Sequence, residues 1–210
     1  MQKSRRHFLS ATALLALGSI PLAASAQGTP VSGRDYVPLP SPQPKEDPKK
    51  IEVIEFFSYG CGHCNDFHPL IKAWAAKQPA DVAFRRVPVV WNAAWGNLAR
   101  LFYTLEATGD LAKMDDAVFA ALHGQRLRLY DEKSMSEWYV RQGGEAKKFS
   151  DAFNSFGVMS KLKRAEQLGK AMGIDSVPTL VVEGRFRVQG KGFEQLLANT
   201  DALIAMSRKK

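Results

Sequence analysis

The strand patterns of this 210-residue chain fall into two groups, one before residue 88 and one after residue 178, and only helical patterns lie between the two groups. β-branched and aromatic runs predict strands, whereas apolar residues at helical spacing, ended by glycines, predict helices. The predicted elements are, in order, a strand over 51–57, a helix over 61–77, a strand over 82–87, five helices between 94 and 173, strands over 179–183 and 186–188, and a helix over 193–207. One face of the first helix is predicted to carry Phe67, Leu70, Ile71 and Trp74.

The helical block is predicted to be a domain inserted into an α/β domain, because it is entered after one strand and left before the next. We expect residues 51–92 and 174–207 to form the discontinuous α/β domain and 93–173 the inserted helical domain. A proline-rich leader over 27–50 precedes them, with at most one short strand near 35–39. The length fits this organisation, since domains usually hold ~100–200 residues.

Residues 1–26 are typical of an export signal that is cleaved near Ala26. Lys3, Arg5 and Arg6 precede an apolar stretch over 11–23 that is too short for a membrane span, which needs ~20 residues. Two adjacent arginines also suit a twin-arginine signal, so the export route stays open. The remaining chain carries 26 basic and 21 acidic residues. This mild excess, without a basic stripe interleaved with aromatic residues, gives no reason to expect nucleic-acid binding.

The chain's two cysteines, Cys61 and Cys64, lie where the first strand gives way to a helix. A helix N-terminus offers free N–H groups and partial positive charge, which stabilise a thiolate at Cys61. His63, in the same turn, can add a cation or a hydrogen-bond donor. A disulfide that closes so small a loop constrains the unfolded chain little, so a redox role is favoured over a structural one. Export would place the pair where disulfides persist.

Two alternatives for the cysteine pair stay open at this point. A structural disulfide is one, and a zinc site completed by His68 and the remote His123 is the other, although the usual second ligand cluster is absent from the sequence. Haem attachment is excluded because Asn65 stands where that motif needs histidine.

Two other features bear on binding. Pro178 precedes a strand, and base rates favour a trans bond after Val177. Trp74 and Trp138 fit helix cores, whereas Trp91 and Trp95, near the domain junction, are better candidates for a substrate groove.

In combination, these motifs resemble the thioredoxin superfamily. The evidence is a strand, Cys61-Gly62-His63-Cys64 at a helix start, a helical insertion, and then Val177-Pro178-Thr179 before a hairpin. The insertion, the export signal and the run Glu55-Phe56-Phe57-Ser58-Tyr59-Gly60-Cys61 are similar to one branch, the periplasmic disulfide-exchange proteins of the DsbA family, as is Phe153-Asn154-Ser155-Phe156. The implied fold is α/β, a thioredoxin fold with an inserted helical domain.

The resemblance implies a role for each site residue. Cys61 would be the exposed nucleophile, Cys64 its buried partner, and His63 would stabilise the Cys61 thiolate. Pro178 would be cis, and Val177 would offer backbone hydrogen bonds to a substrate strand. Glu55 would be a buried acid that assists proton movement at Cys64, although an exposed strand position is the alternative.

Gly62 departs from the best-studied members of the family, which carry proline there, so the redox potential is an open question. The implied activity is a periplasmic oxidase that donates its disulfide to reduced exported proteins. It would use no cofactor beyond the Cys61–Cys64 disulfide and no metal, act as a monomer, and be reoxidised by a quinone-linked membrane oxidase of the DsbB type. The alternatives are a disulfide reductase or isomerase, and a redox-inert or metal-binding thioredoxin-like module.

Overall fold

The computed structural model describes residues 29–209, so the predicted export signal over 1–26 lies outside the described part of the chain. The sequence builds five strands, seven α-helices and one π-helical turn within that range. They are β1 Tyr36–Pro38, β2 Ile51–Phe57, α1 Gly62–Ala75, β3 Val82–Pro88, α2 Ala93–Thr108, α3 Leu111–Phe119, the π-helical turn η1 Ala120–Gly124, α4 Glu132–Arg141, α5 Ala146–Phe153, α6 Phe156–Ala171, β4 Thr179–Val182, β5 Phe186–Val188 and α7 Phe193–Arg208.

The five strands form one mixed sheet in the order β1-β5-β4-β2-β3. β2 lies between β4 and β3, antiparallel to β4 and parallel to β3. In this register Glu55 of β2 stands beside Arg86 of β3 on one side and Leu180 of β4 on the other. Parallel neighbours need a crossover connection, and α1 supplies it between β2 and β3.

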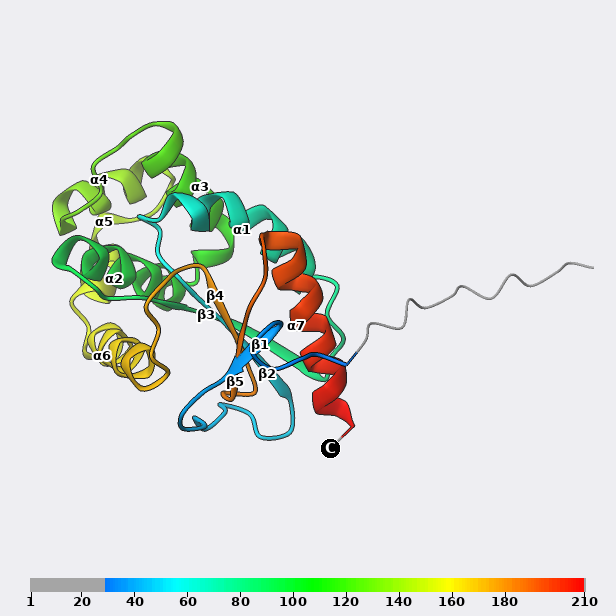
Figure 1. Ribbon diagram of the computed structural model, residues 1–210. Helices are drawn as coiled ribbons and strands as arrows, with labels where there is room; N and C mark the ends of the chain where they lie inside the picture. Colours follow the sequence, from blue (N-terminus) through cyan, green and yellow to red (C-terminus); the bar gives the residue numbers. More distant parts are fainter. Residues whose placement is uncertain (1–28, 210) are drawn as a thin grey trace, which may run out of the picture.

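Helices cover both faces of the sheet and enclose two apolar cores (Figure 1). On one face, Val53, Leu180 and Val182 pack with residues of α1 and α7. On the other face, Ile54, Phe56 and Val181 pack with residues from α2 to α6. Figure 1 shows the helices between β3 and β4 gathered on one side of the sheet, with α7 on the opposite side.

The predicted α/β fold with a helical insertion is confirmed, and the element order agrees with the sequence pattern. The division at residues 92/93 and 173/174 stays a prediction. Two local details differ. Leu70 is 42% exposed although its neighbours Phe67, Ile71 and Trp74 are buried. The helix predicted to run to Gly124 widens into a π-helical turn after Phe119. No helix within residues 29–209 combines the length and apolar character that a membrane crossing requires.

Candidate active site around Cys61 and Cys64

The two cysteines begin helix α1 directly after the turn that follows β2. Cys61 is the N-cap, and its Sγ accepts the N–H of Cys64 at 3.4 Å. This bond satisfies one of the free N–H groups of the helix start, as a capping serine would. Cys61 is partly exposed, Cys64 is fully buried, and both are free thiols in this structure. The fold therefore exposes the Cys61 thiol to solvent and shields the Cys64 thiol from it.

The loop before β4 lies against the reactive side of Cys61. The Val177–Pro178 peptide bond is cis, so the trans bond favoured by base rates is wrong and the isomer implied by the resemblance is confirmed. The Cys61 thiol donates to the Val177 carbonyl at an Sγ–O distance of 3.6 Å. A cavity of about 300 Å³ opens beside this contact, lined by His63, Val177, Pro178, Phe193 and Leu196 among others. A ligand in this cavity would contact Val177, whose carbonyl accepts the Cys61 thiol.

Burial also separates the two thiols electrostatically. Loss of solvent raises the pKa of Cys64 far above its usual value, and the charges of Cys61 and Glu55 raise it further. A backbone hydrogen bond involving Ser58 opposes this shift only in part. Cys64 is therefore held as a thiol, and any step that produces its thiolate needs a proton soon afterwards.

Glu55 is buried beneath the pair, with only 1% of its surface exposed, so the alternative of an exposed strand acid is wrong. Arg86 Nε donates to Glu55 Oε2 at 2.9 Å. Burial raises the pKa of Glu55, the charge of Arg86 lowers it, and the charge of Asp115 raises it. The carboxyl thus has one cationic partner and lies close enough to influence Cys64.

Gly62 and His63 occupy the exposed first turn of α1. Gly62 is the first helical residue, a position at which proline is also well accepted, and a Cβ added there would contact nothing within 4 Å. His63 lines the cavity beside Pro178, and within residues 29–209 it has no hydrogen bond or ion pair. Its stabilisation of the Cys61 thiolate stays a prediction.

The four tryptophans divide between core and surface. Trp74 and Trp138 are buried, as their helical spacing predicts. Trp91 is 46% exposed and stacks on Trp95 with ring centroids 5.3 Å apart. Trp95 also packs against the cysteine turn so closely that a Cβ on Gly60 would lie 2.8 Å from its Nε1. These two rings therefore adjoin the active-site turn.

The histidines considered as zinc ligands are engaged elsewhere. His123 Nε2 lies 2.7 Å from the Tyr59 carbonyl oxygen, and His68 Nε2 lies 2.7 Å from Asp116 Oδ1. The group in residues 29–209 that could hold a metal ion is His68, Asp115 and Asp116. Because Arg86 and Lys72 already pair with its carboxylates at 2.6 Å, a metal ion would have to displace a cation.

Sequence reasoning missed Arg86, which pairs with Glu55, and also Asp115 and the phenol of Tyr59, which extend this network. Tyr59 donates its hydroxyl to Asp115 Oδ1 at 2.5 Å, and Arg86 pairs with Asp115 Oδ2. The available signal was an arginine inside a predicted strand, since a buried cation requires a buried acid. Glu55 is one such acid, and the inserted block supplies a second, Asp115, from α3.

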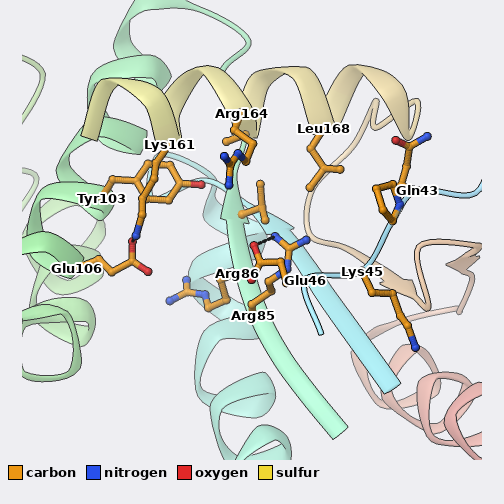
Figure 2. A pocket seen from close by; sticks show the side chains of 13 residues that line it. Gln43, Lys45, Glu46, Arg85, Arg86, Tyr103, Glu106, Lys161, Arg164 and Leu168 are labelled. Carbon is orange, nitrogen blue, oxygen red and sulfur yellow. Dashed lines mark hydrogen bonds and ion pairs between the residues drawn. The ribbon is translucent and has the colours of Figure 1, made fainter. Parts of the chain in front are cut away.

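A larger cavity of about 430 Å³ lies between β3 and α6, apart from the cysteines (Figure 2). Figure 2 shows that charged pairs line it, including Lys161 with Glu106 at 2.7 Å and Arg85 with Glu46 at 3.6 Å. None of the predicted site residues lines this cavity.

Comparison with known proteins places the site in a family context. The model of the DSBA-like thioredoxin domain matches residues 71–200. A thiol:disulfide interchange protein DsbA from Bordetella parapertussis is 39% identical over 205 residues, which cover 96% of each chain. That of Pseudomonas aeruginosa is 36% identical over 200 residues, covering 94% of this chain and 95% of the relative.

Solved structures agree with this result. The crystal structure of Pseudomonas aeruginosa DsbA superposes with a TM-score of 0.81 at 37% identity and covers 84% of this chain and 94% of that one. The oxidoreductase DsbA from Xylella fastidiosa gives a TM-score of 0.82 at 32% identity, covering 87% and 100%. With relatives matched over nearly its whole length and a cysteine pair in this setting, the chain belongs to the DsbA family of thioredoxin-like thiol:disulfide interchange proteins.

Proposed function

We propose that this chain donates the Cys61–Cys64 disulfide to reduced exported proteins through a mixed disulfide at Cys61. The observation that carries the proposal is the inequality of the two thiols. Cys61 is partly exposed at a helix N-terminus, whereas Cys64 is buried and has a strongly raised pKa. A substrate can therefore reach one sulfur only, and the other can serve only as the internal leaving group.

The exchange follows from thiolate chemistry. A substrate thiolate attacks Cys61 Sγ, the Cys61–Cys64 bond breaks, and Cys64 leaves with the electron pair as a thiolate that must be protonated. A second substrate thiolate then attacks the substrate sulfur of the mixed disulfide, and Cys61 leaves. The substrate loses two electrons, which the cysteine pair gains. Release is faster when the leaving thiol is more acidic, and the helix N-terminus favours the Cys61 thiolate in that role.

The neighbouring residues have matching roles in this proposal. Val177 offers its backbone to an extended substrate strand, and Pro178 shapes the adjoining wall of the cavity. His63 stabilises the Cys61 thiolate from the exposed turn. Gly62 leaves the backbone N–H at the first helical position, which a proline would remove, and so influences the redox potential.

We further propose that the mature protein works in the periplasm after cleavage near Ala26. Because the cysteine pair itself holds the two electrons, the exchange needs no bound cofactor. An external acceptor must restore the disulfide, and a quinone-linked membrane oxidase of the DsbB type has the required chemistry. One reactive sulfur and one adjacent cavity suffice for this cycle, so a monomer is expected to be active.

A redox equilibrium tests the direction of the exchange. The mature protein is equilibrated with glutathione buffers of graded potential, and the fraction of Cys61–Cys64 that is oxidised is measured by alkylation and mass spectrometry. A donor is expected to stay reduced even in fairly oxidising buffer. A bridge that persists in strongly reducing buffer would instead indicate a reductant or a structural bond, and the donor role would be abandoned.

Trapping tests the position of the mixed disulfide. Cys64→Ser should accumulate a covalent adduct with a disulfide-containing peptide, because Cys61 can attack it and the resolving thiol is gone. The matched variant Cys61→Ser should form almost none, since Cys64 is buried. Equal trapping by both variants would contradict the assignment of Cys61 as the reactive sulfur.

A further inference from the structure

A buried carboxylate, Glu55, and a partly buried one, Asp115, share a single arginine beneath the cysteine pair. Arg86 Nε bonds Glu55 Oε2 at 2.9 Å, and its other arm, Nη1, bonds Asp115 Oδ2 at 2.6 Å. The side chains of Glu55, Arg86 and Asp115 are 1%, 11% and 14% exposed. Water is kept from Glu55, whereas Arg86 and Asp115 also line a cavity, and Arg86 balances both acids.

The groups around Arg86 hold its guanidinium between Glu55 and Asp115. The guanidinium lies over the Phe57 ring, 3.8 Å from the centroid, and its Nη2 is buried without a partner. Asp115 also accepts the hydroxyl of Tyr59 at 2.5 Å. A swing of Arg86 toward either acid would cost its contact with the other.

The outer side of the cluster carries further titratable groups. His68 Nε2 from α1 lies 3.6 Å from Asp115 Oδ2 and 2.7 Å from Asp116 Oδ1. Lys72, also from α1, pairs with Asp116 at 2.6 Å. On the inner side, Cys64 is the titratable neighbour whose pKa Glu55 influences. Asp115 thus stands between a solvent-facing pair and the buried acid.

We propose that Asp115 is a positioning residue for disulfide exchange, because by sharing Arg86 it keeps Glu55 able to hold the proton that Cys64 takes up. The proposal rests on the exchange role given above. A carboxyl paired with an arginine of its own would remain ionised and have no proton to give. With no arginine, the carboxylate left after transfer would be unsupported in a dry site.

Each proton in this step comes from a group of the chain or from water. When the Cys61–Cys64 bond breaks, the Cys64 thiolate takes the proton of the Glu55 carboxyl group. Glu55 becomes a carboxylate, which Arg86 stabilises, and it regains a proton from solvent water before the next cycle. Asp115 takes no part in bond making. It belongs to α3 in the predicted inserted domain, so that helix contributes to the electrostatics of the cysteine site.

The test uses two variants that should act in opposite directions. Asp115→Asn leaves Arg86 to Glu55 alone and removes a neighbouring negative charge, so Glu55 should titrate at lower pH. Arg86→Met removes the cation, so Glu55 should titrate at higher pH. The readout is the carboxyl carbon resonance of Glu55 in the reduced full-length mature protein, followed by NMR across the pH range. A merely structural role would not produce opposite shifts.

Two further variants serve as controls. Arg85 is next to Arg86 but pairs with Glu52 at 3.0 Å on the opposite face of the sheet, so Arg85→Gln should leave the Glu55 titration unchanged. Asp115→Glu retains the charge and should restore most of the native titration. If Arg86→Met fails to fold, the contrast between Asp115→Asn and Asp115→Glu decides the question alone.

A kinetic measurement provides the second readout. The readout is the rate of single-turnover oxidation of a reduced model peptide, corrected for the peptide's own thiolate fraction. As pH rises, this rate should begin to decline at a lower pH in Asp115→Asn than in the native protein. At mildly alkaline pH we expect its rate to be several-fold below that of the native protein. An unchanged or upward-shifted Glu55 titration in Asp115→Asn would overturn the proposal. Because the NMR titration is independent of the direction of exchange, failure of the donor role in glutathione buffers would be seen separately.

Discussion

Cys61 and His63 share one exposed turn, and their chemistry depends on how that turn meets the helix. The thiol of Cys61 accepts a backbone N–H and lies against the Val177 carbonyl, so the fold fixes its position on two sides. His63 has no partner within residues 29–209 that would hold its ring elsewhere. The ring is therefore free to orient toward a thiolate that forms beside it.

Replacing His63 tests this electrostatic contribution at the scale of one residue. In His63→Ser we expect Cys61 to be alkylated more slowly by iodoacetamide at mildly acidic pH, because less of it is thiolate. We also expect the disulfide to become less oxidising in glutathione buffers. Unchanged alkylation across the pH range would show that the helix start alone stabilises the thiolate. Lys72→Ser, on the same helix but paired with Asp116, is the matched control.

Strand β2 places two acids, Glu52 and Glu55, on opposite faces of the sheet, since they are three positions apart and side chains alternate along a strand. Both are buried, and each pairs with one of two successive arginines of β3, Glu52 with Arg85 and Glu55 with Arg86. Glu52 also accepts the backbone N–H of Glu46, which ties the leader to the sheet. The same local pattern thus provides one pair on each face of the sheet, and of the two acids Glu55 is the one whose charge acts on Cys64.

Glu52→Gln tests this difference between the two pairs. The free energy of unfolding should fall by ~1–3 kcal/mol, because the partly buried Arg85 loses its charged partner. Peptide oxidation at neutral pH should stay at the native rate, because Glu52 lies on the far side of the sheet from the cysteine network. Urea unfolding of the reduced protein and single-turnover oxidation measure the two quantities. A loss of rate without a loss of stability would contradict this division.

At the scale of elements, the sequence predicts structure that depends on neighbouring residues and misses contacts between residues far apart in the chain. The strand at 51–57 and the helix start at Cys61 could be predicted because apolar spacing and capping chemistry are written in neighbouring residues. The contact between Arg86 and Asp115 joins residues 29 positions apart and depends on how α3 packs, which no local pattern encodes. Leu70 was misplaced for a related reason, since helical spacing defines an apolar face but not how far its neighbours extend over it.

The redox state of the pair is linked to the stability of the whole molecule. Reducing the disulfide and unfolding the chain are two sides of a thermodynamic cycle, so a bond that folding makes easier to reduce must destabilise the folded protein. The small Cys61–Cys64 loop adds little compensating entropy, because loop-closure stabilisation grows with loop length. A Cys61 thiolate stabilised by the helix N-terminus, as proposed above, would add to the preference for the reduced pair.

The oxidised protein should therefore unfold at a lower urea concentration than the reduced protein. This order is the reverse of that expected for a structural disulfide. Circular dichroism of both forms in parallel urea titrations measures it, with Cys61→Ser as a control that cannot change redox state. A more stable oxidised form would contradict the donor role together with its thermodynamic basis.

The edge strands of the sheet are β1 and β3, and neither is well suited to pair with a strand of another chain. β1 has three residues and finishes at Pro38, while β3 finishes at Pro88 and carries Arg85 and Arg86, whose charges are held by buried acids. Short edges, prolines and inward charges are how natural sheets avoid aggregation. Under the proposed function, reduced exported proteins would present exposed strands at every encounter. Because these edges discourage backbone pairing, the proposed exchange at Cys61 would engage and release such partners without the chain becoming part of an aggregate.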